Sequence, residues 1–128
     1  MSMELPVPGT LESPFGVFES KIFSYKKQKI EEKKYTKWFD YDKIKDSPCV
    51  RTRRQGDYLT VNSEGGKKKL NRIFIDEKIP AEMRDRIPVV AAGSEILWIP
   101  GGRMNEKYKI TSTTGRVLEL HYQGGALA

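Results

Sequence analysis

Arginines and lysines are the side chains of this 128-residue sequence whose types and spacing could do chemistry. Arg51 and Arg53 lie two positions apart in residues 50–54, which we expect to be extended, so both would point to one face of a strand. Two guanidinium groups on one face can bind phosphate oxygens through paired hydrogen bonds. The alternative is that they pair with acidic neighbours such as Asp57 or Glu95. The sequence leaves both interpretations open.

A second basic group follows Gly65 and Gly66, where we expect a turn that opens a helix. Lys67 and Lys68 would then lie at the start of that helix, where positive charge opposes the helix dipole. This unfavourable placement indicates that the lysines serve a ligand, with a solvated surface as the alternative. Arg72 lies one helical turn after Lys68 and would share its face.

The charge balance favours an anionic partner. The sequence has 23 lysines and arginines against 17 aspartates and glutamates, a net charge of +6 and a pI of about 9.4. Such a surplus is typical of proteins that bind nucleic acid or a membrane surface, although it also serves solubility. Arg103 is a further candidate for a phosphate contact, because it follows Gly101 and Gly102, where the backbone could come close to a ligand.

Catalytic and metal-binding patterns are not recognisable in the sequence. Residues 63–68 do not form a phosphate-binding loop, because the first glycine is missing and Lys68 stands where serine or threonine is required. The S-G-G-x-D-S loop of adenylating enzymes is absent as well. The single cysteine, Cys49, and the single histidine, His121, cannot build the usual zinc site or a nucleophilic pair. We therefore predict no catalytic residue, no metal ligand and no cofactor for this domain.

Length and composition fit one ordinary cytoplasmic domain. We expect a single domain over residues 1–128, with residues 1–14 and 124–128 flexible. No apolar run approaches the roughly 20 residues that a membrane span needs, so we expect no membrane partner. A single cysteine fits a reducing cytosol.

The spacing of apolar residues predicts an α+β domain of many short strands, one clear helix and one short helix. The clear helix opens after Gly66, with Leu70, Ile73 and Phe74 on its buried face. A short helix follows Pro80, and residues 26–34 form a mobile loop. We expect strands over residues 15–25, 35–44, 50–54, 58–61, 89–92, 95–99, 107–110 and 116–122.

Four aromatic residues in the predicted strands could stack bases. They are Trp38, Phe39, Tyr41 and Trp98. Strand aromatics belong more often to the core, and we favour the core for Phe39 and Trp98.

Several motifs together resemble one family. They are L-P-V-P-G-T at residues 5–10, F-D-Y-D-K-I at 39–44, R-x-R-x-x-G-D from Arg51, K-K-L at 68–70 and I-P-x-x-x-R-D-R-I-P at 79–88. In this order they resemble the C-terminal domain of bacterial tRNA(Ile)-lysidine synthetase. The resemblance covers most of the chain, but residues 26–34 match no family motif.

The resemblance implies a function for the basic surplus. Enzymes of this family use ATP, with magnesium, to join lysine to the wobble cytidine of isoleucine tRNA, and their catalytic domain lies N-terminal to the resembling region. That implies a non-catalytic β-sandwich-like domain that grips tRNA, with the catalytic domain of the same protein as a second partner. The alternative is a docking module that organises the parent enzyme or forms a homodimer. The residues we predict to bind RNA are Arg51, Arg53, Lys67, Lys68, Arg72 and Arg103.

Overall fold

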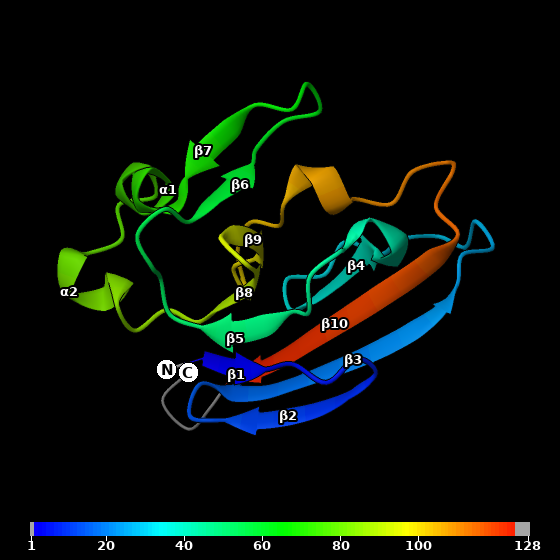
Figure 1. Cartoon of the computed structure of the whole chain (residues 1–128), viewed down its shortest axis with the longest axis horizontal. Coiled ribbons are helices and arrows are strands. Elements are labelled where there is room, and N and C mark those ends of the chain that lie inside the picture. Colours follow the sequence, from blue (N-terminus) through cyan, green and yellow to red (C-terminus); the bar gives the residue numbers. More distant parts are fainter. Residues whose placement is uncertain (1, 125–128) are drawn as a thin grey trace. The chain divides into compact units, whose positions relative to one another are not determined.

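Two sheets and two short helices make up the chain (Figure 1). The computed structural model describes residues 2–124. The described residues fall into two compact units: unit 1 within Met1–Glu4 and Asp46–Lys107, and unit 2 within Leu5–Lys45 and Tyr108–Ala128. The predicted α+β class, with short and mostly antiparallel strands, is confirmed.

Unit 1 holds a six-stranded sheet and both α-helices. The helices are α1 (Leu70–Asp76) and α2 (Ala81–Arg84). Neighbouring strands pair antiparallel, except that β6 (Tyr58–Thr60) and β9 (Glu95–Trp98) meet at one parallel bridge. In spatial order the strands are β1 (Ser2–Glu4), β5 (Cys49–Arg51), β8 (Val89–Ala92), β9 (Glu95–Trp98), β6 (Tyr58–Thr60) and β7 (Lys67–Lys69).

The core of unit 1 forms where α1 buries one face. Leu70, Ile73 and Phe74 are each about 1% exposed, which confirms the face predicted from their spacing. They pack with Leu59, Val89, Ala91, Ile96 and Ile99 in one cluster. Trp98 is also fully buried, as expected. The strands predicted at 89–92 and 95–99 pair as the β8–β9 hairpin, and Gly93 at its turn has a φ of 63°, which favours glycine.

The start of α1 differs from the prediction. Lys67 and Lys68 lie in strand β7, and the helix begins only at Leu70. The reason is the turn before them: the side-chain oxygen of Asn62 accepts hydrogen bonds from the backbone N–H groups of Glu64 and Gly66, at 3.0 and 2.9 Å. That turn connects β6 and β7 into a hairpin. The two glycines therefore lead into a strand instead of opening a helix.

Unit 2 holds a four-stranded antiparallel sheet. Its strands, in spatial order, are β2 (Gly9–Ser13), β3 (Gly16–Ser24), β10 (Arg116–Gly124) and β4 (Thr36–Asp40). Along β10 the side chains alternate, so that Leu118 and Leu120 are fully buried while Glu119 and His121 remain partly exposed on the other face. Phe39 of β4 is opposite Leu118 and is fully buried, as expected.

Other local predictions need correction. Residues 107–110 do not form a strand, because the 3₁₀-helix η2 (Glu106–Tyr108) begins there, where the side chain of Asn105 accepts the N–H of Lys107 at 2.9 Å. Strand β4 ends at Asp40, and η1 (Tyr41–Lys43) follows it. Residues 26–33 contain neither helix nor strand, as expected.

The N-terminal segment forms strands, although we expected it to be flexible. Residues 1–14 contribute β1 and β2, because each pairs with a strand from elsewhere in the sequence: β1 with β5, and β2 with β3. Proline and glycine in this segment mark the break between those strands. Gly124 is the last residue of β10, and the prediction for residues 125–128 lies outside the described part of the chain.

Candidate nucleic-acid interface

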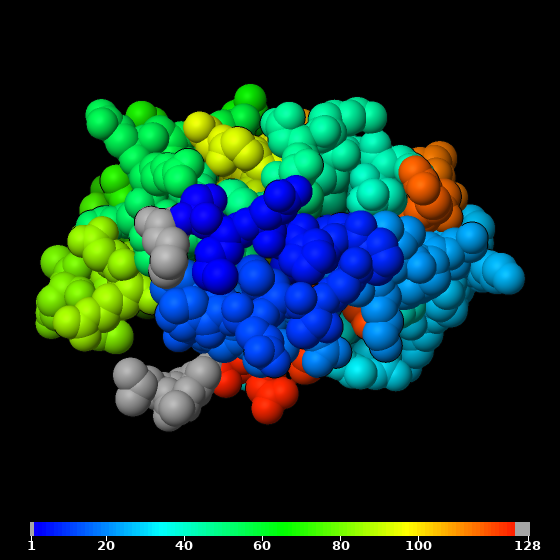
Figure 2. Space-filling model, turned by 60° about the horizontal axis from the view of Figure 1, so that its bottom comes forward, coloured from blue at the N-terminus to red at the C-terminus, as the bar shows by residue number. Residues whose placement is uncertain are grey.

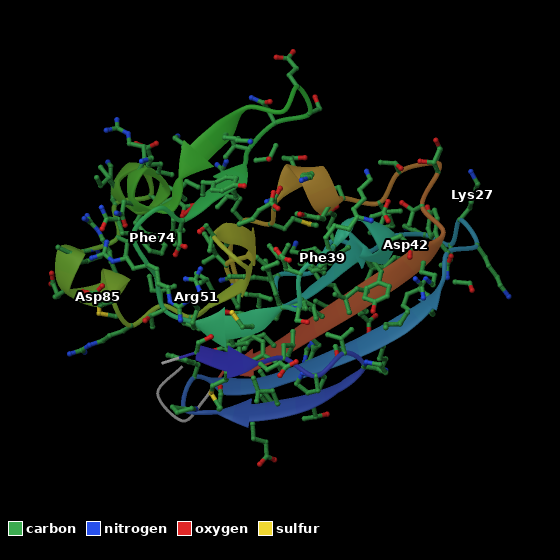
Figure 3. The ribbon with its side chains drawn as sticks, viewed as in Figure 1. Lys27, Phe39, Asp42, Arg51, Phe74 and Asp85 are labelled. Atoms are coloured by element: carbon green, nitrogen blue, oxygen red, sulfur yellow. The ribbon has the colours of Figure 1, made fainter. Side chains whose placement is uncertain are left out.

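Arg51 is a structural residue of unit 1. It is 1% exposed, and its two terminal nitrogens donate to the two carboxylate oxygens of Asp57, each at 2.8 Å. Figure 3 labels Arg51 among the side chains drawn as sticks. They donate as well to the backbone oxygens of Thr52 and Gly93, at 3.0 and 2.9 Å. The hydrogen bonds to Asp57 raise the pKa of the guanidinium. The structure therefore shows the pairing of Arg51 with Asp57 that the sequence left open, and a phosphate contact by Arg51 stays a prediction.

Arg53 does not share a strand face with Arg51, because β5 ends at Arg51. Its Nε donates to Asp85 at 2.8 Å, just after α2, and one terminal nitrogen donates to the side-chain oxygen of Asn71 in α1 at 3.0 Å. The hydrogen bond from Arg53 lowers the pKa of Asp85. Because the Arg53 side chain is 25% exposed, part of the guanidinium remains within reach of a ligand.

Two of the predicted residues contact one carboxylate, and the charge of a third lowers its pKa. Lys68 forms an ion pair with Asp76, and the Nε of Arg72 lies 3.1 Å from the other oxygen of Asp76. A hydrogen bond from Lys68 lowers the pKa of Asp76 most, and the charges of Arg72 and Arg103 lower it further. We call these four residues the Asp76 cluster. Lys68 of β7 and Arg72 of α1 contact Asp76 directly, whereas Arg103, in the loop after β9, acts on it through its charge.

Lys67 lies on the other face of β7 from Lys68, because side chains alternate along a strand. It is exposed, and its Nζ lies 5.4 Å from the ring centre of Tyr58. Lys69 shares this face and stands opposite Tyr58 in the β6–β7 register. Lys69 was not among the residues predicted to bind RNA, although it belongs to the same K-K-K run.

The two units differ in charge. Unit 1 has twelve lysines and arginines against ten aspartates and glutamates, whereas unit 2 has eleven against seven. Most of the surplus of +6 therefore belongs to unit 2, where only Lys109 and Arg116 lie outside residues 5–45. No group of three or more His, Cys, Asp or Glu side chains among residues 2–124 is arranged to hold a metal ion. No helix in that range is long and apolar enough to cross a bilayer.

These features define a small α+β domain with a basic surface, and comparison with known proteins places it. Residues 49–120 match the family described as the TilS substrate C-terminal domain. A crystal structure of a TilS C-terminal domain superposes with a TM-score of 0.78 at 34% identity, covering 97% of this chain and 96% of that one.

Two relatives support the same assignment. The chain is 51% identical over 88 residues to the tRNA(Ile)-lysidine synthase of Caldanaerobacter subterraneus subsp. tengcongensis, covering 69% of this chain and 19% of the relative. It is 38% identical over 123 residues to that of Geobacillus kaustophilus, covering 94% and 26%. The chain belongs to the family of TilS C-terminal domains. It spans between a fifth and about a quarter of the length of these two relatives.

Proposed function

We propose that this domain grips tRNA for a tRNA(Ile)-lysidine synthase and takes no part in the chemistry itself. The name of the relatives, family membership and the Asp76 cluster support the proposal. The cluster is the observation that carries it, because two cations from separate elements, Lys68 and Arg72, pair with one carboxylate and the charge of a third, Arg103, also acts on it. A phosphate group offers more acceptor oxygens and more charge than Asp76.

The remaining parts of the reaction belong, in this proposal, to the rest of the parent enzyme. ATP and magnesium would bind to its catalytic domain, which would be the second partner of this domain, in the cytoplasm. Isoleucine tRNA would be the RNA held. The purified chain alone is expected neither to release pyrophosphate nor to form lysidine when ATP, lysine and tRNA are supplied. Product formed by the chain alone would contradict the division of roles.

Salt-dependent binding of a tRNA transcript tests the proposal. If about four phosphates are contacted, counterion release predicts that the affinity falls roughly fifty-fold or more between 50 and 200 mM salt. Replacing Lys68, Arg72 and Arg103 together by glutamine is expected to weaken binding at least about tenfold and to reduce the salt slope by about 2. Binding that is absent at low salt, or unaffected by the triple replacement, would refute the role of the cluster.

A matched control comes from unit 2. Lys43 and Arg116 also pair with carboxylates, Asp40 and Asp42, but each of those pairs is closer to balance. Replacing both by glutamine removes two exposed cations without touching the Asp76 cluster. We expect tRNA affinity to change by about twofold or less, the effect of a small loss of general attraction.

A docking module is the second candidate, and exposed apolar side chains favour it. Ile75 on α1 is 48% exposed and Met83 on α2 is 44% exposed. Figure 2 shows the yellow-green segment that contains α2 at the molecular surface. Self-association that persists at high salt and is lost in Ile75→Lys, together with an absence of tRNA binding, would favour this candidate over the first.

A further inference from the structure

A cavity on unit 2 has a polar lining that the Asp76 cluster does not account for. Its volume is about 180 Å³. This is smaller than the roughly 300–1,000 Å³ of pockets that enclose a drug-sized ligand, so it would hold one planar ring system. The lining residues are Lys29, Glu31 and Lys33 of the loop over residues 26–34, Thr36 and Trp38 of β4, and Glu119 of β10.

The floor of this cavity is the polar face of the four-stranded sheet. Trp38 stands directly opposite Glu119 in the β4–β10 register, and its Nε1 donates to a carboxylate oxygen of Glu119 at 3.0 Å. Phe23 meets the Trp38 ring edge-on, with centroids 5.0 Å apart and an interplanar angle of 75°. The indole is therefore fixed in orientation before any ligand arrives, which reduces the entropy lost on binding.

The second carboxylate oxygen of Glu119 is an available acceptor. Glu119 is partly exposed, and no other partner for its side chain is found among residues 2–124. The neighbouring pair on the same face, Thr36 and His121, is satisfied internally by a hydrogen bond of 2.7 Å. Glu119 is thus the group on the cavity floor that can take a hydrogen bond from a ligand.

The loop over residues 26–34 adds cations at the rim. Lys33 pairs with Glu31 at 3.3 Å, and both side chains are more than half exposed. Lys29 is exposed and has no ion-pair partner within the described part of the chain. Figure 2 shows this segment, in light blue to cyan, projecting from the surface. The lysines can therefore reach a backbone phosphate while a base occupies the floor.

This combination of groups matches an unstacked nucleotide. Aromatic side chains stack on RNA bases, lysines contact phosphate, and a carboxylate accepts from the exocyclic amino group of a base. A free anion is a poorer match, because Glu31 and Glu119 would repel it. Uracil is also a poorer match, since it carries no amino group and its single N3–H donor is flanked by two carbonyl oxygens that the carboxylate repels.

We propose that this cavity binds one unstacked base of an RNA and prefers adenine or cytosine to uracil. The inference rests on the proposed function, because that RNA would be the tRNA. It gives the loop over residues 26–34, which matches no family motif, a role in recognising a single-stranded part of the substrate. The Asp76 cluster, which lies in unit 1, would hold phosphates independently.

Tryptophan fluorescence of the full chain provides the test. Trp98 is fully buried, so a change in emission on adding RNA reports mainly on Trp38. Short single-stranded oligomers of adenylate, cytidylate and uridylate are titrated separately. We expect the adenylate and cytidylate oligomers to quench the emission and to bind at least about fivefold more tightly than the uridylate oligomer, a difference in the range of one base contact.

Two variants separate recognition from structure. Glu119→Gln retains an oxygen for Trp38 but replaces the other acceptor with an amide N–H₂, so the preference should shift toward uridylate. Lys29→Ala should weaken all three oligomers about equally, whereas its matched control Lys26→Ala, in the same loop but outside the cavity, should not. Should Glu119→Gln fail to fold, Lys29→Ala against Lys26→Ala still decides the matter.

Equal binding of the three oligomers, with no effect of Glu119→Gln and Lys29→Ala, would overturn the inference. The tRNA titration in the same buffer then identifies which idea has failed. If tRNA binds and responds to the Asp76 cluster variants while Trp38 emission never changes, only the cavity assignment is lost. If no RNA of either kind binds, the proposed function falls and this inference falls with it.

Discussion

Unit 1 and unit 2 use their positive charge differently. In unit 1 the arginines of the family motifs build structure: Arg51 is buried against Asp57, and Arg53 joins the two helical segments through Asn71 and Asp85. In unit 2, half of the lysines lie in the loop over residues 26–34, which matches no motif. Of these loop lysines, Lys33 pairs with a carboxylate, that of Glu31. A basic residue in a family motif is therefore not always a free cation: Arg51 and Arg53 are paired within the fold, whereas most lysines of the loop have no carboxylate partner among the described residues.

The buried pair of unit 1 should produce the largest effect. Asp57→Ala leaves the guanidinium of Arg51 buried without its counter-charge, and we expect a loss of about 3–5 kcal/mol in the free energy of unfolding. The matched control is Asp85→Ala, which removes the partner of Arg53 at a site where the carboxylate is 76% exposed and the ion pair is screened by solvent, so the expected loss is much smaller. Urea denaturation measures both. Similar losses for the two variants would contradict the difference between the buried Arg51–Asp57 pair and the exposed Arg53–Asp85 pair.

An intermediate effect should follow from removing the carboxylate of the Asp76 cluster. In Asp76→Asn, Lys68 and Arg72 no longer have a competing internal partner, so tRNA affinity should rise by about fivefold or less. Asp42→Asn in unit 2 frees Arg116 in the same way but outside the cluster, and should change affinity by less. Binding at fixed salt measures both. A fall in affinity for Asp76→Asn would mean that Asp76 orders the cluster instead of competing for it.

The smallest effect concerns acid stability. The pKa values of Asp42, Asp76 and Asp85 are lowered below the ordinary 3.8 by the hydrogen bonds of Arg116, Lys68 and Arg53. A carboxyl whose folded pKa is depressed stabilises the fold above the unfolded pKa, and this stabilisation is lost as the pH falls through the folded value. The Tm of the wild type should therefore fall more steeply below pH 4 than that of Asp42→Asn. Asp76→Asn with Asp85→Asn should flatten the curve further, since it removes two such groups, and parallel curves would contradict the assignment.

Local chemistry made part of this structure predictable. The face of Leu70, Ile73 and Phe74 follows from helical spacing, and the β8–β9 hairpin follows from Gly93. The β6–β7 hairpin was missed because it depends on the side chain of Asn62 capturing two backbone N–H groups, a competition that glycine positions alone do not reveal.

The candidate site was less predictable, because its contacts link distant parts of the chain. The burial of Arg51 depends on the carbonyl of Gly93, forty-two positions away in sequence, as well as on Asp57. Lys68 meets Asp76 only because a strand passes directly into a helix at Leu70. Sequence spacing singled out these basic residues, but it could not decide which of them would be neutralised by a partner within the fold.

The position of β10 in the sequence has a consequence for how the chain folds. This strand lies between β3 and β4 in the sheet of unit 2, yet it is the last strand of the described chain, and its residue Val117 pairs with Phe23 and Asp40 (Figure 1). Such pairings close long loops and raise the contact order, which slows folding. Until β10 is inserted, β3 and β4 each present an open edge that another chain could join. During synthesis unit 2 therefore stays incomplete until the ribosome has released almost the whole of this segment, and that interval is when it is most prone to aggregate.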